Sequence, residues 1–442
     1  MPASIFYNSG RKLSLCSGNT TGATPGLLPS PYYWWESGAM FMHLVDYYYY
    51  TQDSTYNDET IQAAIWQASK VGNLMPANQT TTEGNDDQGS PWPKVYSISA
   101  WPLTLSETST DLRPIALRQA LRWDAANCGG GLRWQVSVIP AGSRACAHAL
   151  QIFPTNTGYN YKNTVANGGF FMLAARLARF TGNQTYVDWA TKEWDWWSQS
   201  KLFGGNSTYQ VNDGMTISNK QCPDADHTQW SYNYGLLIGG LAFLYNTTED
   251  TKWLAPLNGL LNRTLQEFFP ASMGDKIMVE AACEPYGTCD TNGWTFKSFV
   301  MRWLALTAQL VPNTATTIWP YIQASGQGAA GQCDGGSDGI TCDFRWNSTT
   351  WDGTYGVGQQ MSALAAIQAN LITVNNLRAP YTAATGGTSP GDPSAGSGSS
   401  DANPNESGLY TRTIGTGDKA GAGILTALAL IMTLGGAYFL VK

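Results

Sequence analysis

Two consecutive aspartates, Asp86 and Asp87, are the residues of this chain best suited to chemistry. They lie in the polar segment 82–88, which reads Thr-Glu-Gly-Asn-Asp-Asp-Gln. Adjacent carboxylates repel each other, so a fold keeps them together mainly for a metal ion or for acid/base chemistry. Cleavage of a glycosidic bond needs two such groups, one ionised and one protonated. The alternative is a solvated loop or a helix N-terminus, where aspartate is common.

The composition is rich in aromatic residues and poor in charge. The 442 residues suffice for one large domain or two ordinary ones, and they include 18 Trp and 22 Tyr but only 13% charged residues. Such rings stack on sugar faces, although most of them must belong to the core. The net charge of −7 and the lack of a basic run argue against a nucleic-acid partner.

Glycosylation sequons indicate a protein of the secretory pathway. They are found at Asn19, Asn78, Asn183, Asn206, Asn246, Asn262, Asn347 and Asn405. The N-terminal residues 1–18 nevertheless contain no basic start followed by an apolar run, as a signal peptide would. We therefore expect the natural start to differ from this irregular N-terminus.

The cysteines favour disulfides over a metal site. There are eight cysteines, only three histidines and no C-x-x-C motif. Two short-range pairs lie in Gly-rich turns, Cys283 with Cys289 and Cys333 with Cys342. Cys128 and Cys222 would make a sensible third bridge.

The C-terminal region has the order of a glycosylphosphatidylinositol (GPI) attachment signal. Small residues around 405–408 are followed by a polar spacer and then by a hydrophobic tail, 420–442, that ends in a single lysine. A transmembrane helix is the alternative, but no basic cytoplasmic anchor follows. The preceding segment 380–418 is rich in Gly, Ser, Thr and Pro, which predicts a disordered stalk.

The remaining chain predicts an all-α protein, since strand-like alternation is scarce. Apolar spacing indicates helices over 167–180, 185–202, 230–245, 253–269, 296–310 and 358–371. Three similar polar segments follow aromatic-rich stretches and predict short turns between antiparallel helices, at 51–56, 181–186 and 246–251. Repeated helix hairpins of this kind close into an α/α toroid, with loops for a site at one end.

Together, several short motifs resemble glycoside hydrolase family 76, the endo-α-1,6-mannanases, and in particular its fungal GPI-anchored cell-wall branch. The matching stretches are PGLLP (25–29), YYWWESG (32–38), EGNDDQ (83–88), CGGGLRWQ (128–135), YKNT (161–164), NG (167–168), WSYN (230–233), FK (296–297), RW (302–303), DG (352–353) and GVGQQM (356–361). The resemblance covers roughly 19–371. It implies an (α/α)6 domain, which we expect to span 19–379.

The resemblance also implies a retaining mechanism carried by the aspartate pair. Asp86 resembles the nucleophile and Asp87 the general acid/base, whose pKa a neighbouring carboxylate would raise. Retention needs carboxyl groups only about 5–5.5 Å apart, which adjacent side chains can reach. The candidate sugar-binding residues are Trp34, Trp35, Asn85, Arg133, Asn163, Asn167, Asp213, Tyr232, Asn233 and Asp352.

Each of these candidates has a plainer alternative. One ring of the pair Trp34 and Trp35 could belong to the core. An Asn or Arg in a Gly-rich loop often serves a turn or a helix cap, and Glu36 could also cap or form an ion pair.

Two segments depart from the family's pattern. Two prolines in 89–94 interrupt the helix expected to follow the aspartate pair, so 89–110 puts the support of the nucleophile in doubt. The segment 136–151 contains the unmatched Cys146 and His148 and separates stretches that should be contiguous. Val-Ser and Gln codons can carry splice sites, so we expect 136–151 to be a retained intron. Cys16 is also unmatched, which leaves six cysteines for three bridges.

The expected activity is cleavage of α-1,6-mannosidic linkages at the fungal cell surface. Transglycosylation shares this chemistry and would move a GPI-core glycan onto wall glucan. The alternative is an inactive cell-wall glycan-binding or structural protein. No cofactor or metal is expected, because G-x-G-x-x-G, P-loop and H-E-x-x-H motifs are absent. We expect a monomer that is exposed outside the plasma membrane and attached through a GPI anchor.

Overall fold

The computed structural model describes residues 26–67, 84–86, 119–135 and 158–374, apart from Asp338 and Thr349, and all of these belong to one compact unit. The described helices are α2 (Trp34–Thr51), α3 (Asn57–Gln67), α7 (Thr164–Thr181), α8 (Gln184–Gln199), α9 (Ser231–Thr248), α10 (Leu254–Phe268), α11 (Phe296–Leu310), α12 (Ala315–Gly331), α13 (Val357–Ala369) and α14 (Leu371–Val374). Short 3-10 turns lie at Thr251–Trp253, Ala271–Met273, Glu284–Tyr286, Gly293–Thr295 and Pro312–Thr314.

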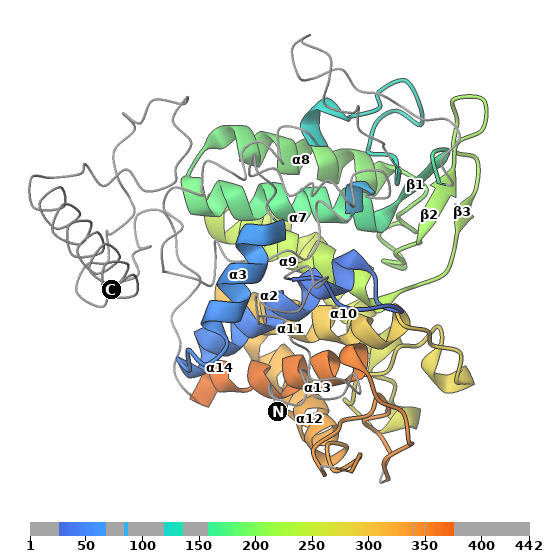
Figure 1. The fold of residues 1–442 in the computed structure, drawn as a ribbon. Helices are drawn as coiled ribbons and strands as arrows, with labels where there is room; N and C mark the ends of the chain where they lie inside the picture. Colours follow the sequence, from blue (N-terminus) through green and yellow to red (C-terminus); the bar gives the residue numbers. More distant parts are fainter. Residues whose placement is uncertain are drawn as a thin grey trace, which may run out of the picture. The chain divides into compact units, whose positions relative to one another are not determined.

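Two kinds of helix alternate along the chain. α2, α7, α9, α11 and α13 are buried along most of their length, whereas α8, α10 and α12 bury only one face. A helix that is apolar all round must be enclosed by protein, and an amphipathic helix covers it from outside. The buried helices pack in the order α7, α9, α11, α13, α2 (Figure 1). This arrangement confirms the predicted toroid of helix hairpins.

Two glycines bring the buried helices close together. A Cβ added at Gly239 of α9 would lie 2.3 Å from Met172 of α7, and one added at Gly240 would lie 2.3 Å from Phe171. Any larger residue at either position would therefore force the side chain of Met172 or Phe171 to move. The sequence predicts a helix over 230–245. The structure explains the glycines of this helix, because they lie against side chains of α7.

The three predicted turns share one hydrogen-bond pattern. Thr51, Thr181 and Thr248 each end a buried helix and donate their hydroxyls to the carbonyl four residues earlier. Each hydroxyl then accepts the backbone N–H two residues later, from an Asp or Asn whose own side chain starts the next turn. The prediction of short polar turns is confirmed. The helices α2, α3 and α12 were not predicted.

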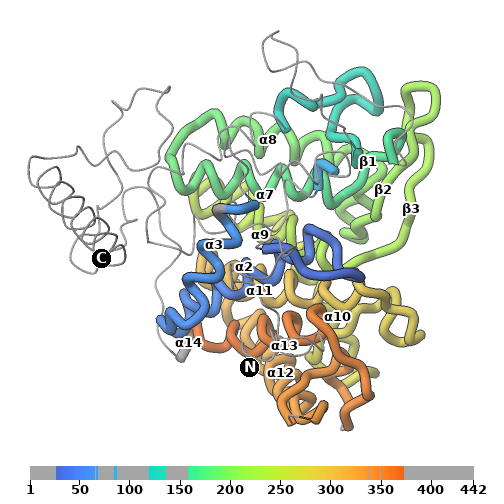
Figure 2. Tube along the Cα trace, in the orientation of Figure 1, coloured from blue at the N-terminus to red at the C-terminus, as the bar shows by residue number. Residues whose placement is uncertain are grey.

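The described strands form a small antiparallel sheet at the N-terminal end of α7. β1 (Tyr161–Asn163) pairs with β2 (Gly214–Thr216), which pairs with β3 (Ala225–Asp226). Asn163 lies opposite Gly214 in this register. Figures 1 and 2 show the sheet beside the start of α7. It joins the chain before α7 to the segment that leads into α9.

Three disulfides tie the loops, Cys128 with Cys222, Cys283 with Cys289 and Cys333 with Cys342. These are the three pairs expected from the sequence. The first closes a loop of 94 residues and so removes the most freedom from the unfolded chain.

A buried ion pair joins two helices across the ring. Asp46 of α2 accepts two hydrogen bonds from the guanidinium of Arg302 of α11, at 2.5 and 3.0 Å, and both side chains are almost fully buried. Loss of one partner would leave an uncompensated charge in the core. The two helices are therefore linked by charge as well as by apolar packing.

We predict that Asp46→Ala lowers the free energy of unfolding by about 3–5 kcal/mol, because Arg302 stays buried without its carboxylate. Urea denaturation followed by circular dichroism measures this loss. Lys276→Ala is the control, since its ion pair with Asp275 is exposed and should contribute little. Equal effects of the two substitutions would contradict the prediction.

Candidate active site

Asp86 is placed by its neighbour Asn85, which is fully buried. The Asn85 backbone N–H donates to the Trp134 carbonyl at 2.9 Å, and its side-chain amide donates to the Arg133 carbonyl at 2.6 Å. Arg122 donates to the Asn85 side-chain oxygen at 2.8 Å. Asn85 therefore does not face a substrate, contrary to the sugar-binding expectation; it fixes the backbone from which Asp86 projects.

The indole of Trp134 contacts the carboxylate of Asp86. Trp134 Nε1 donates to Asp86 Oδ2 at 3.0 Å, and both residues are partly exposed. The Trp134 ring lies edge-on to Tyr161, with ring centroids 6.1 Å apart. A fixed donor on one oxygen orients the carboxylate, as a nucleophile requires.

A second carboxyl group, Asp213, lies beside the same aromatic rings. The hydroxyl of Tyr161 donates to Asp213 Oδ2 at 2.9 Å. Burial raises the pKa of Asp213, and the nearby Asp226 adds to the rise, while Tyr161 and the amide of Asn233 oppose it. Asp213 therefore lies near Asp86, because the rings of Tyr161 and Trp134 connect the two carboxyl groups.

Tyr232, at the start of α9, connects these groups. Burial raises its pKa well above the usual value, and the charges of Asp213, Asp86 and Glu280 raise it further. Its ring lies 4.3 Å from that of Phe296 at the start of α11. The candidate site is therefore an acidic and aromatic cluster at the N-terminal ends of α7, α9 and α11.

Glu280 was not recognised from the sequence. It is fully buried and accepts hydrogen bonds from both the backbone N–H and the hydroxyl of Ser231, the first residue of α9. Burial raises the pKa of Glu280 to about 8. It thus caps α9 from a distant segment and holds the helix end that carries Tyr232, and no local motif marks this role.

Two predicted sugar-binding asparagines instead support the backbone. Asn163 caps α7 by accepting the Ala166 N–H at 3.3 Å. Asn167 is fully buried, and its amide bonds both the N–H and the carbonyl of Leu132, at 2.7 and 3.1 Å. The capping role left open by the sequence describes Asn163, whereas Asn167 lies inside α7 and ties the backbone of Leu132 to that helix.

Arg133 is also occupied by protein groups. It donates to Asp124 Oδ2 at 2.8 Å and to the Tyr159 carbonyl at 2.9 Å, and it lies over the Tyr159 ring. Little of its side chain is exposed. The structure assigns it to the loop before Trp134 and not to sugar binding.

The remaining candidates are divided between the core and the surface. Trp34 is buried, and its indole donates to Gln67, whereas Trp35 is partly exposed and lies against Phe299. Asn233 is fully buried close to Asp213. Asp352 is exposed in the loop before α13, where its side chain accepts from Thr354, so it serves a turn.

Several predictions lie outside the described residues. These are Asp87, Asn19, Asn78, Asn405, Cys16, Cys146, His148, the segments 1–18, 89–110 and 136–151, the stalk 380–418 and the tail 420–442. Among the described helices, none is both long and apolar enough to cross a membrane. Within the same ranges no three His, Cys, Asp or Glu residues cluster as metal ligands would.

The described sequons differ in exposure. Asn183, Asn206, Asn262 and Asn347 are exposed. Asn246 is partly buried, and its amide accepts from Arg179 at 2.7 Å and donates to the Leu310 carbonyl at 3.0 Å. Asn246 is therefore the least accessible of the described sequons.

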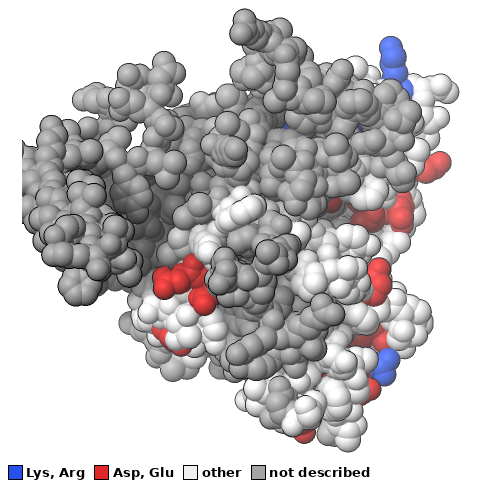
Figure 3. All heavy atoms as spheres, viewed as in Figure 1, with Lys and Arg blue, Asp and Glu red and all other residues white. Residues whose placement is uncertain are grey.

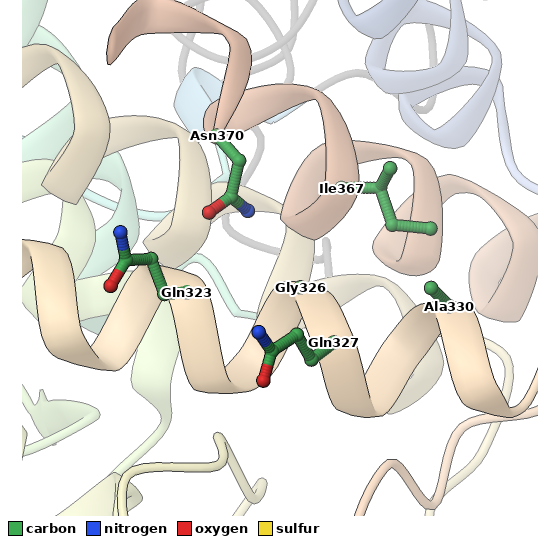
Figure 4. A pocket seen from close by; sticks show the side chains of 6 residues that line it. All are labelled: Gln323, Gly326, Gln327, Ala330, Ile367 and Asn370. Atoms are coloured by element: carbon green, nitrogen blue, oxygen red, sulfur yellow. The ribbon is translucent and has the colours of Figure 1, made fainter. Parts of the chain in front are cut away.

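The surface charge and two further cavities were compared with the position of Asp86. On the face in Figure 3, acidic side chains are more prominent than basic ones, in keeping with the net charge of −7. One cavity of about 470 Å³ lies between α12 and α13 (Figure 4), lined by Gln323, Gln327 and Asn370 among others. A second of about 470 Å³ lies along α8. Neither contains Asp86.

The helix toroid and its acidic site define a glycoside hydrolase, and comparison with known proteins gives the family. Glycosyl hydrolase family 76 matches residues 9–145 and 149–384, so the chain belongs to that family. Mannan endo-1,6-alpha-mannosidase DCW1 of Saccharomyces cerevisiae is 42% identical over 431 residues, which cover 96% of this chain and 89% of that protein.

Solved structures agree with this assignment. Dfg5 from Chaetomium thermophilum, in complex with glucosamine, is 36% identical with a TM-score of 0.69, and the match covers 86% of this chain and 91% of that one. An inactive variant of the α-1,6-mannanase GH76A of Salegentibacter sp., in complex with α-1,6-mannotriose, is 16% identical with a TM-score of 0.60. That match covers 77% of this chain and 89% of that chain, and it concerns the fold alone.

A further buried carboxyl group, Glu36, lies in the first turn of α2. It accepts the Tyr33 N–H at 2.6 Å, which is the capping role left open by the sequence. Burial raises the pKa of Glu36 to about 7, the Tyr33 N–H opposes the rise, and Asp290 adds to it. Between the ordinary pKa and 7, the folded chain therefore holds a proton that the unfolded chain releases. Stability falls as the pH rises through this window.

We predict that Glu36→Gln removes a pH-dependent loss of stability of on the order of 2–3 kcal/mol between about pH 5 and 7. Glutamine keeps an oxygen for the Tyr33 N–H but carries no charge. Urea denaturation across this range measures the effect. Asp195→Asn, at an exposed carboxylate, is the control and should keep the wild-type slope. An unchanged slope in Glu36→Gln would refute the assignment.

Proposed function

We propose that this protein is a retaining glycosidase or transglycosidase that acts on α-1,6-mannosidic linkages. The observation that carries the proposal is the Asp86 carboxylate, oriented by the Trp134 indole at 3.0 Å, in a family 76 chain that is 42% identical to a mannan endo-1,6-alpha-mannosidase. A carboxylate that is already held in one orientation loses less conformational freedom when it attacks a substrate.

In the proposed reaction, Asp86 attacks the anomeric carbon of the mannosyl unit as the bond to the leaving oxygen breaks. Asp87 gives its proton to that oxygen. Asp87 then takes a proton from the incoming water or sugar hydroxyl, whose oxygen displaces Asp86 from the anomeric carbon. Two inversions retain the configuration, and both aspartates return to their starting states.

Hydrolysis and transfer differ only in what reaches the glycosyl-enzyme. Water gives hydrolysis of α-1,6-mannan, and a sugar hydroxyl gives transglycosylation. We propose GPI-core glycans as donors and wall glucan as the acceptor. The partly exposed rings of Trp134 and Tyr232 near Asp86 support this, since aromatic faces stack on sugars and exclude water.

Among the sugar-binding candidates, Asp213 and Tyr232 are proposed to meet the substrate. Both lie near Asp86, and Asp213 is oriented by the Tyr161 hydroxyl at 2.9 Å. A carboxyl oxygen held by one donor still has lone pairs for a sugar hydroxyl. The other candidates would then affect the substrate only indirectly, through the backbone that they hold in place; these are Asn85, Arg133, Asn163 and Asn167.

Asp86→Asn should abolish both hydrolysis and transfer, because the amide is a poor nucleophile. Asp87→Asn should lose activity on poor leaving groups yet still be glycosylated by a mannosyl fluoride, which needs little acid help. A fluorosugar trap followed by peptide mass spectrometry locates the adduct on Asp86. Asp352→Asn, in an exposed loop, is the control and should stay active. Substantial activity of Asp86→Asn on α-1,6-mannan would refute the proposal.

We propose that the protein works as a monomer outside the plasma membrane, with domain 19–379 carried on stalk 380–418 and a GPI anchor replacing tail 420–442. Phospholipase that cleaves GPI should then release it from membranes. Truncation before residue 420 should send it folded into the medium, because the family match ends at residue 384. Retention on membranes after phospholipase treatment would favour a transmembrane tail.

A further inference from the structure

Lys162, in the middle of β1, is a fully buried lysine surrounded by backbone carbonyls. Its ammonium donates to the carbonyls of Asn127 at 2.7 Å, Asp124 at 3.1 Å and Gly130. It also lies 3.4 Å from the Asp124 carboxylate. A buried cation is costly unless it is paired and hydrogen-bonded, and here several acceptors meet that need.

The acceptors belong to one loop, 124–131, whose shape makes its carbonyls converge. Cys128, Gly129, Gly130 and Gly131 all have positive φ, from 55° to 145°. A Cβ on Gly130 would lie 2.4 Å from Trp123, and one on Gly131 would lie 2.1 Å from Trp196. Converging carbonyl oxygens repel each other, so the loop needs a central donor to stay in this shape.

The same loop leads directly to Asp86. Trp134, three residues after Gly131, donates its N–H to the Tyr161 carbonyl at 2.7 Å, next to Lys162 in the chain. The Trp134 carbonyl accepts from Asn85, and its indole reaches Asp86. The path from the ammonium to the carboxylate therefore runs through one short stretch of backbone.

We propose that Lys162 is a positioning residue for the glycosyl-transfer reaction. Its ammonium holds the 124–131 loop in the conformation that brings the Trp134 indole to Asp86. The inference rests on the proposed role of Asp86 as the nucleophile.

The carboxyl groups around Lys162 favour the charged form of its amine. Burial lowers the pKa of Lys162 to about 8, and Asp124 opposes the fall, as does Glu193 more weakly, while Arg133 adds to it. The amine therefore stays protonated at neutral and acidic pH. Arg133 shares Asp124 with Lys162, so one carboxylate ties the start of the loop to both cations.

A double-mutant cycle tests the route from Lys162 to Asp86. Trp134→Phe removes the indole N–H and should lower kcat about tenfold or more on α-1,6-mannan, with KM changed less than about twofold, because a charge-assisted hydrogen bond is lost. Lys162→Met, which keeps the length but removes the charge, should lower kcat in the same way. In the Trp134→Phe background, Lys162→Met should cost less than about threefold, because both act through one contact.

Lys297→Met is the matched control. Lys297 is also fully buried, and it pairs with Glu284 at 2.7 Å and with the Phe344 carbonyl at 2.7 Å, outside the 124–135 loop. Its effect on kcat should multiply with that of Trp134→Phe. If the effect of Lys162→Met on kcat also multiplies in full with that of Trp134→Phe, Lys162 is only structural and the inference is wrong.

Two further variants keep the test decisive. If Lys162→Met does not fold, Asp124→Asn takes its place in the double-mutant cycle, because Asp124→Asn removes the carboxylate partner of Lys162. Its effect on kcat in the Trp134→Phe background should then also be less than about threefold. Asp86→Asn is measured beside the cycle. If Asp86→Asn is inactive and the effects of Lys162→Met and Trp134→Phe on kcat multiply, only the inference is wrong. If Asp86→Asn is active, both the proposed function and the inference are wrong.

Discussion

The hydrogen bonds of Asn85 are the constraint on which the rest of the site depends. Its backbone and side chain bind the carbonyls of Trp134 and Arg133, which lie 48 or more residues further along the chain. Gln119 and Arg122 in turn bind the carbonyl and the side-chain oxygen of Asn85. A fully buried amide must satisfy its polar atoms, and here each partner belongs to a segment that shapes the surroundings of Asp86. The position of the carboxylate follows from this one satisfied residue.

The helices explain why these segments meet at one end of the molecule. α7, α9 and α11 are buried along most of their length and pack in that order, so the residues that precede each of them gather at a common end. Helix N-termini leave unbonded N–H groups, which Asn163 and Glu280 satisfy at α7 and α9. The caps are therefore also the supports of the site, because the start of α7 directly follows the strand of Tyr161 and the start of α9 carries Tyr232.

The site gathers carboxyl groups that would repel each other if all were ionised. Asp86, Asp213 and Glu280 all act on Tyr232, and burial raises the pKa of both Asp213 and Glu280. Protonation of Asp213 or Glu280 relieves the repulsion, and the hydroxyls of Tyr161 and Ser231 hold these two carboxyl groups in place. A retaining glycosidase needs one ionised and one protonated carboxyl group, and such an environment is able to supply both.

By themselves, the residues of this chain determined the fold class, the three disulfide pairs, the helix hairpins and the polar turns between them. Apolar spacing and Thr-x-Asx turns act over a few residues, so they can be read locally. Only the tertiary structure decided that Asn85 and Asn167 face the backbone, that Trp34 is buried and that Trp134 reaches Asp86. Those roles depend on partners such as Leu132, Arg133 and Gln67, which lie 33 to 48 residues away in the chain. An amide or an indole has the same hydrogen-bonding groups in either role, and only its neighbours in space decide which one it takes.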